Sequence, residues 1–191
     1  MNKHRAALLL PFAALSLAAQ APKLGFDVQA SLLIGTGDMK KMSEKNPTGL
    51  SLGGALRYHP DPDLGFRLHL DLASIKGVEG SGLSSSKPTF LGLDVMREAG
   101  RWTFYGGLLG TRWNQDEGSA TLNTFSDAPD PANNRRFNNF GSGTKLGARV
   151  GLEFEYRPGL RAHLAFTQSE FNKMYQPSWI SVGATWRFAS F

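Results

Sequence analysis

The chain lacks cysteine, long apolar stretches and a strong excess of one charge, and each absence narrows the choice of fold. Without cysteine no disulfide can form, so stability must come from packing and strand closure. After the first twenty-odd residues no segment reaches the ~18 consecutive apolar residues of a transmembrane helix, and none shows convincing helical periodicity. The formal net charge of +5 does not imply a nucleic-acid partner. These absences favour a single all-β domain.

Residues 1–21 have the features of a secretory signal peptide. Lys3 and Arg5 form a charged start, and the apolar run that follows is too short to span a bilayer. We expect cleavage near residues 18–21 and a mature domain over residues 22–191. Cleavage lowers the formal net charge from +5 to +3, because the removed segment carries Lys3 and Arg5 and no acidic residue. The sequence therefore predicts an exported protein.

Eight segments of the mature chain alternate apolar and polar residues with the period of two that is typical of a half-buried strand. The last is the clearest, and its apolar face carries Ile180, Val182, Ala184, Trp186 and Phe188. Segment 102–113 has large apolar residues on both faces, which a bulge at Gly106 and Gly107 would explain. The expected strands cover residues 26–34, 50–58, 64–72, 91–96, 102–113, 145–156, 160–167 and 178–191.

The connections between these segments alternate long and short along the chain. Transmembrane β-barrels have this asymmetry, with tight periplasmic turns and long external loops. Aromatic rings gather at membrane interfaces, and here they fall near the strand ends. Those near the expected periplasmic ends are Phe26, Tyr58, Phe66, Trp102, Phe104, Phe154, Tyr156, Trp186 and Phe188. Those near the other rim are Phe171, Tyr175 and Trp179.

The segment Ser181-Val182-Gly183-Ala184-Thr185-Trp186-Arg187-Phe188 resembles the terminal signal of bacterial outer-membrane β-barrels, which their assembly machinery recognises. Ser181, Gly183, Trp186 and Phe188 carry the resemblance. Three residues follow Phe188, so either a bulge restores the phase or Phe191 lies beyond the barrel.

Over residues 22–191 the chain resembles the small outer-membrane barrels of the OmpA and OmpX type. The resemblance implies an all-β fold, namely an eight-stranded antiparallel up-and-down transmembrane β-barrel in the outer membrane. It also implies outer-membrane lipid and the barrel assembly machinery as partners. We expect a monomer without a cofactor.

Charged residues alternate with the leucine-rich faces of the strands, and the two faces suit different solvents. Leucines that face lipid and ions that face a closed lumen satisfy both, whereas the inverted arrangement would leave ions in hydrocarbon. The expected lumen network comprises Arg67, Asp71, Asp94, Arg149, Glu153, Glu155, Arg161, His163 and Arg187, with Asp27, Arg57 and Lys145 as further inward candidates. Side chains can fill a lumen of eight strands, so we interpret this network as an ion-pair plug. Gating or passage of small ions is the alternative.

The hairpin at Arg157-Pro158-Gly159 makes the register testable. A three-residue turn places Tyr156 opposite Leu160, Glu155 opposite Arg161 and Glu153 opposite His163. Both charged pairs are then expected to face inward.

These features favour a structural or surface-interaction role, with the external loops as the binding surface. Arg135 and Arg136 lie in the longest connection beside phenylalanines, and could grip lipid phosphates or a partner at the cell surface. A solvated loop is the alternative for these two residues. The alternative for the whole protein is a narrow porin-like channel for small solutes or ions.

Enzymatic activity is not expected. Barrel enzymes that deacylate lipid A carry a His-x-Ser pair, which neither His163-x-Ala165 nor His69-x-Asp71 matches. A lipid A-modifying enzyme is therefore the third alternative. His69 and Asp71 lie two residues apart on one strand face and could hold a metal, but we interpret them as a lumen ion pair, and no metal is expected.

Overall fold

A computed structural model describes residues 23–37, 47–76, 85–112, 144–171 and 176–190, and these form strands and short connections. No helix in the described part of the chain is long and apolar enough to cross a membrane. The strands are β1 (Lys23–Gly37), β2 (Thr48–His59), β3 (Leu64–Lys76), β4 (Ser85–Ser86), β5 (Thr89–Ala99), β6 (Trp102–Arg112), β7 (Thr144–Arg157), β8 (Leu160–Gln168) and β9 (Pro177–Ser190). The predicted signal peptide lies outside the described residues.

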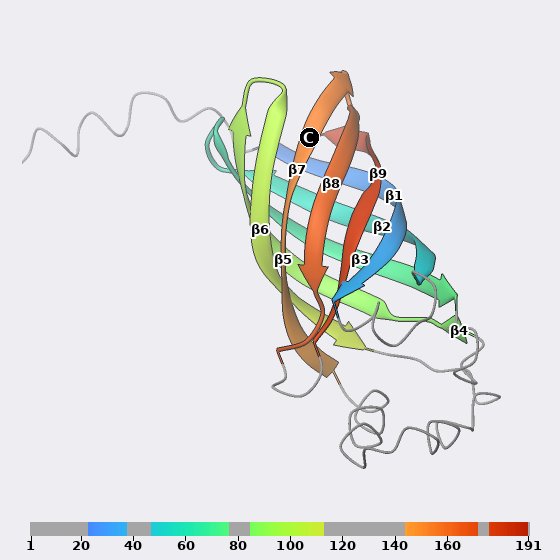
Figure 1. Ribbon diagram of the computed structural model, residues 1–191. Helices are drawn as coiled ribbons and strands as arrows, with labels where there is room; N and C mark the ends of the chain where they lie inside the picture. The colour runs from blue at the N-terminus through green and yellow to red at the C-terminus, as the bar shows by residue number, and fades with distance from the viewer. Residues whose placement is uncertain (1–22, 38–46, 77–84, 113–143, 172–175, 191) are drawn as a thin grey trace, which may run out of the picture.

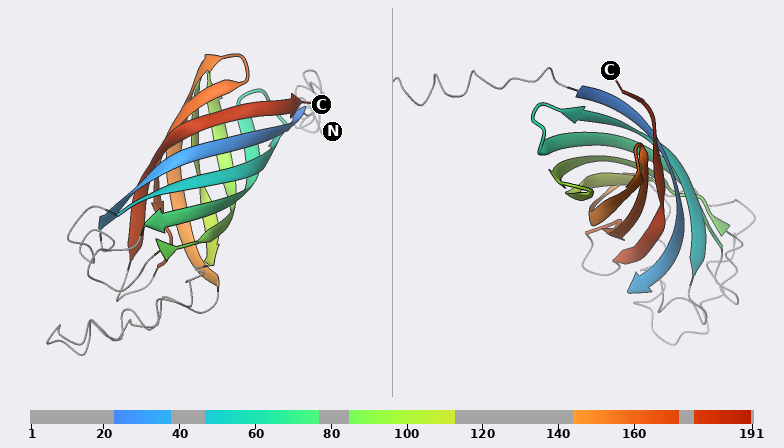
Figure 2. Two further views of the ribbon diagram at one scale, coloured as in Figure 1. Left: turned by 90° about the vertical axis from the view of Figure 1, so that its right-hand side faces the viewer. Right: turned by 90° about the horizontal axis from the view of Figure 1, so that it is seen from above.

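The eight long strands form a closed antiparallel barrel, as the alternation predicts (Figures 1 and 2). Their order is β2-β1-β9-β8-β7-β6-β5-β3, and the pairing of β2 with β3 closes the ring. The two-residue strand β4 is an unpredicted addition to the end of β3. The longest ladder joins the first strand to the last, from Gly25 opposite Ser190 to Gly37 opposite Pro177.

The two ends of the barrel differ. One end carries the start of β1, the end of β9 and the tight connections 60–63, 100–101 and 158–159, and we call it the turn end (Figure 2). Gly100 and Gly159 have φ values of 63° and 78°, a left-handed conformation that favours glycine in such turns. The opposite end, which we call the loop end, receives the longer connections between strands.

The strands turn their apolar faces outward and their polar faces into the lumen. Leu50 is 67% exposed and Leu52 62%, whereas Arg57 and Asp94 are fully buried. Most of the exposed apolar side chains are leucines and aromatics distributed around the barrel wall. This arrangement inverts that of a soluble barrel and suits a surface surrounded by lipid.

The prediction of a bulge in β6 is wrong. The strand pairs without a register shift with both β5 and β7. Trp102, Phe104 and Leu108 face outward, and Tyr105 and Leu109 face inward. The lumen has room for large side chains beside β6. Apolar residues therefore occur on both faces of this strand, although no bulge changes which residues face outward.

Two bulges occur at the turn end instead. On β9, Phe26 pairs with Ala189 and Asp27 with Arg187, so Phe188 is the extra residue. A bulge in the terminal segment was one of the two expected alternatives, and Phe191, whose position was to distinguish them, lies outside the described residues.

The second bulge lies in the β7–β8 hairpin. Glu153 lies opposite His163 and Glu155 opposite Arg161, as predicted, but Arg157 and not Tyr156 pairs with Leu160. The predicted pairing of Tyr156 is therefore wrong, because the turn is one residue shorter and a bulge takes up the difference.

Two further expectations need correction. Trp179 was expected at the membrane rim, but it is buried inside the barrel, while Phe171 is exposed. Tyr175 lies outside the described residues. Glu98 was expected in a turn, but it lies in β5 and contacts the lumen residue Arg161.

Candidate functional site

The lumen contains two layers of different chemistry, and the first is an apolar cluster near the loop end. Its members come from the loop-end halves of five strands, and they are Leu33, Ala73, Ile75, Phe90, Leu109 and Trp179. The rings of Phe90 and Trp179 pack with their centroids 5.0 Å apart. Close-packed apolar side chains exclude water, so this cluster forms a dry layer in the loop-end part of the lumen.

The second layer is an ionic network in the middle of the barrel, centred on Glu153. The carboxylate of Glu153 accepts hydrogen bonds from Arg57 Nη2 at 2.6 Å and from Arg67 Nη1. Arg57 also donates to Asp27, and Arg67 Nε donates to Asp94 Oδ2 at 2.8 Å. Glu153 thus joins two Arg–Asp pairs, one formed between β1 and β2 and the other between β3 and β5.

Arg149 extends this network toward the loop end. Its Nη2 and Nε donate to Asp94 at 2.5 and 2.9 Å, and its Nη1 lies 3.7 Å from Asp71. Asp71 in turn lies 2.7 Å from His69 Nδ1. The network therefore continues through alternating cations and acids, as buried charges require.

His163 lies apart from the acids although the register places it opposite Glu153. Its Nε2 is 2.8 Å from Ser31 Oγ and its Nδ1 is 3.1 Å from Thr185 Oγ1. A serine within reach of a histidine can act as a nucleophile, but the adjoining cavity of about 30 Å³ has room for only one or two waters. On the lumen side, the Ser31–His163 pair therefore adjoins only a small cavity.

Inward-facing glycines make room for the large polar side chains of the next strand. A Cβ on Gly92 would lie 2.2 Å from His69 Nε2, and one on Gly53 would lie 1.8 Å from Asp71 Oδ1. Such distances are far shorter than van der Waals contact. The sequence pattern did not reveal this role, because glycines look neutral in an alternating strand.

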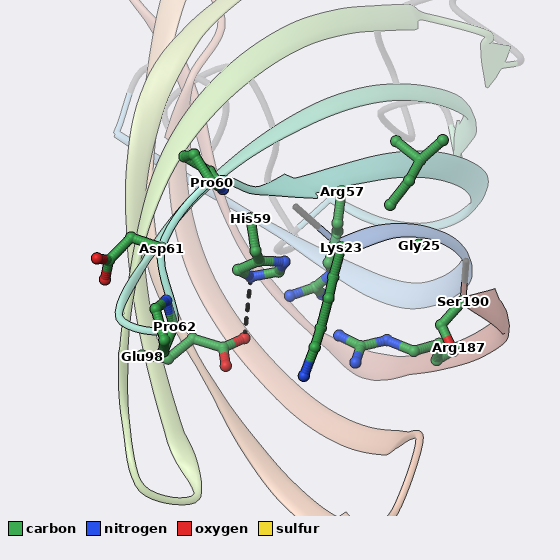
Figure 3. A pocket seen from close by; sticks show the side chains of 11 residues that line it. Lys23, Gly25, Arg57, His59, Pro60, Asp61, Pro62, Glu98, Arg187 and Ser190 are labelled. Atoms are coloured by element: carbon green, nitrogen blue, oxygen red, sulfur yellow. Dashed lines mark ion pairs between the residues drawn. The ribbon is translucent and has the colours of Figure 1, made fainter. Parts of the chain in front are cut away.

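A cavity of about 430 Å³ opens below the ionic network at the turn end, and we call it the vestibule (Figure 3). It is lined by Lys23, Leu24, Gly25, Arg57, His59, Pro60, Asp61, Pro62, Glu98, Arg187 and Ser190. Glu98 Oε1 lies 3.2 Å from His59 Nε2 and 3.3 Å from Arg161 Nη2. Arg161 also lies 3.9 Å from Glu155, which accepts a hydrogen bond from the amide of Gly159 at 3.0 Å.

The structure thus brings most of the nine expected lumen residues into contact. Arg67, Asp94, Arg149 and Glu153 form its centre, and Asp71, Glu155 and Arg161 lie around them. Arg187 lies at the edge, 3.6 Å from Asp27, whereas His163 bonds only to hydroxyls in the described structure. Lys145 is separated from the network and lies 3.7 Å from Glu170.

Sequence reasoning missed several contributors. Extending the alternation of β5 by one period would have placed Glu98 inward. Tyr105, whose ring lies 4.0 Å below the Arg67 guanidinium, was ambiguous because both faces of β6 carry aromatics. Gln29, which donates to Asp71, and Ser31 gave no signal beyond a polar face.

The remaining expected positions divide between the wall and the undescribed loops. Trp186 and Phe188 of the terminal segment face outward and are more than half exposed, while Ser181 is buried on the lumen side. Arg135 and Arg136 lie outside the described residues. No cluster of three or more potential metal ligands occurs among the residues that the structure describes.

Comparison with known proteins extends to solved structures alone. Neither a protein-family model nor a curated protein matches the sequence. The attachment invasion locus protein Ail of Yersinia pestis superposes with a TM-score of 0.50 at 16% identity, covering 88% of this chain and 100% of that one. Neisserial surface protein A superposes with a TM-score of 0.51 at 16% identity, covering 90% and 99%. At such identities the likeness concerns the fold.

Proposed function

We propose that this small eight-stranded barrel lies in the bacterial outer membrane and acts there as a plugged scaffold with a structural or surface-interaction role. The observation that supports the proposal is that two layers of buried side chains, the apolar cluster and the ionic network, lie inside the barrel. The external loops are then the part of the protein that can meet a partner.

The ionic network supports closure because its members hold each other in place. Arg57, Arg67 and Glu153 are each at most 1% exposed, and a buried charge that loses its partner is strongly unfavourable. An ion that entered the lumen would have to break several of these pairs together. The apolar cluster adds a barrier of a different kind, since it offers a permeant ion no polar partner.

The role of the loops is supported by analogy. Ail is named for attachment and invasion, and the present barrel shares its architecture. In such barrels the tight turns face the periplasm and the long loops face outward, so the loop end would be exposed at the cell surface. A variant shortened within residues 114–143 should fold normally and lose adhesion to cells or a ligand. Unchanged adhesion would contradict a role for this loop.

Conductance in planar lipid bilayers tests the plug directly. The purified protein should give no steady ion current, because both layers close the lumen. Trp179→Ala and Glu153→Gln should each remain silent while the other layer persists, and the double variant should conduct. A stable current through the unmodified protein would instead favour the narrow porin-like channel.

The enzyme alternative has its own test. A lipid A modification assay on cells that produce the protein should show no change, with His163→Ala as the control. Modification that disappears in His163→Ala would contradict the proposed scaffold role, because it would require a substrate to reach the Ser31–His163 pair.

A further inference from the structure

The vestibule at the turn end contains cationic groups whose binding capacity is unused. Figure 3 shows Lys23, Arg57, His59, Arg187 and Glu98 around a common space. Arg57 forms the inner boundary, and its guanidinium is occupied by Asp27 and Glu153. Lys23 and Arg187 differ from Arg57 in this respect.

Arg187 has donors that are shielded from water and lack an acceptor. Its Nε and Nη2 atoms are buried and make no hydrogen bond within the described structure. The nearest acid is Asp27, whose unpaired Oδ1 lies 3.6 Å from Nε while its Oδ2 accepts a hydrogen bond from Arg57. Nε therefore faces an acid, and Nη2 is the buried donor that lacks an acceptor in the described structure, which is unfavourable.

Lys23 lies at the start of β1 and lines the same cavity. It forms no ion pair with any other residue that the structure describes. Two cations, one with a forked guanidinium and one with a compact ammonium, therefore line the same space.

The acids of the vestibule are already engaged. Glu98 interacts with His59 and Arg161, and Asp61 accepts a hydrogen bond from the amide of Asp63 at 2.9 Å within the turn. Neither acid forms an ion pair with Lys23 or Arg187 within the described barrel.

We propose that the vestibule is a binding site for a small oxyanion of the phosphate type. Arg187, whose side chain is 30% exposed, would turn its terminal guanidinium nitrogens toward two of the phosphate oxygens, and Lys23 would supply the second positive charge. The volume of about 430 Å³ lies within the range of about 300–1,000 Å³ for small-molecule sites. The phosphate can therefore be the terminal group of a larger molecule that enters from the periplasm.

Binding of inorganic phosphate to the complete mature barrel tests the site. The protein is held in a phosphate-free maltoside detergent, and binding is followed by titration calorimetry and by ³¹P line broadening. Saturable binding is expected, and Arg187→Gln and Lys23→Gln should each weaken it at least about tenfold, in keeping with the strength of charge-assisted hydrogen bonds. Arg187→Lys should weaken binding less than Arg187→Gln, because it keeps the charge and loses the fork.

Arg97→Gln is the matched control, because Arg97 lies in the same end of β5 as Glu98 but is exposed on the outer side of the wall. It removes one positive charge without altering the vestibule, and phosphate affinity should stay within about twofold of the original protein, as expected for a screened surface charge. Heat-modifiable gel migration checks that each variant forms a closed barrel. Absence of saturable binding, or an equal loss in Arg97→Gln, would overturn the proposal.

The same titration in nanodiscs distinguishes a lipid headgroup from a soluble phosphate. Anionic phosphatidylglycerol should lower the apparent phosphate affinity, relative to zwitterionic phosphatidylcholine, if its headgroup occupies the vestibule. Equal affinity in the two lipids would assign the site to a soluble phosphate compound. In either lipid, binding that survives Arg187→Gln unchanged would contradict the site.

Discussion

The loop-end and turn-end halves of the lumen are both occupied by buried side chains, but those side chains are apolar in one half and charged in the other. Near the loop end, Phe90 and Trp179 pack in an apolar cluster. Toward the turn end, the space is filled by arginines and acids that bond across the barrel. The stability of the apolar cluster depends on the volume of its side chains, whereas the stability of the ionic network depends on the charge and hydrogen-bonding groups of each partner. The two halves should therefore respond differently to substitution.

The largest effect is expected for Glu153→Gln. This change removes the charge that joins Arg57 and Arg67 and leaves buried cations without full compensation, which costs about 3–5 kcal/mol. Urea unfolding in detergent would measure the loss. The matched control is Glu155→Gln on the same strand, since the Glu155 side chain is 31% exposed and lies 3.9 Å from Arg161, and its loss should be below about 1 kcal/mol. Similar losses for the two variants would show that the network tolerates the loss of its centre.

Trp179→Ala should have the next largest effect. It deletes a buried ring from the apolar cluster and leaves a cavity, at a cost of about 3 kcal/mol in unfolding free energy. Trp179→Phe keeps most of the volume and should lose less than about 1.5 kcal/mol. Trp186→Ala, which removes an outward-facing ring from the same strand, should lose less than Trp179→Ala because lipid can fill the space. If Trp186→Ala cost more, the apolar cluster would not be a packed layer.

The smallest of the three effects is expected for Gly92→Ala. The new Cβ would displace the His69 ring, which lies 2.7 Å from Asp71, and overpacking of this kind costs about 1–3 kcal/mol. Gly106→Ala is the control, since the Cβ would meet only Arg149 O at 3.6 Å, and it should be neutral or slightly stabilising in a strand. Thermal unfolding of both variants measures the difference. Equal stability of the two would mean that His69 moves without cost.

The barrel and the facing of its strands could be predicted because the alternation is a local property. For residues such as Leu68 and Arg67, the position in the alternating pattern is enough to predict whether the side chain faces outward or into the lumen. The alternation also places Trp179 inward with Ser181, but the general tendency of aromatic rings to gather at membrane rims argued for the opposite position. In this case the apolar cluster offered the ring a better environment than the interface.

The partners across the lumen could not be predicted. Arg57 and Glu153 are 96 residues apart, and Ser31 and His163 are 132 apart, and neither pair lies on adjacent strands. Such contacts depend on the diameter and shear of the closed barrel, which no local pattern contains. The bulge beside Arg157 was equally hidden, because it changes the pairing without changing the alternation nearby, whereas the phase of the terminal segment had allowed the bulge opposite Phe26.

The seam between β1 and β9 has a consequence for the order of assembly. Asp27 belongs to the first strand, and Trp179 belongs to the last, which spans fourteen residues. The interior therefore receives essential members from both extremes of the polypeptide, and the apolar cluster cannot be completed while the last strand is missing. Up to that moment the arginines must stay hydrated, so the ring closes and its interior dries in one event.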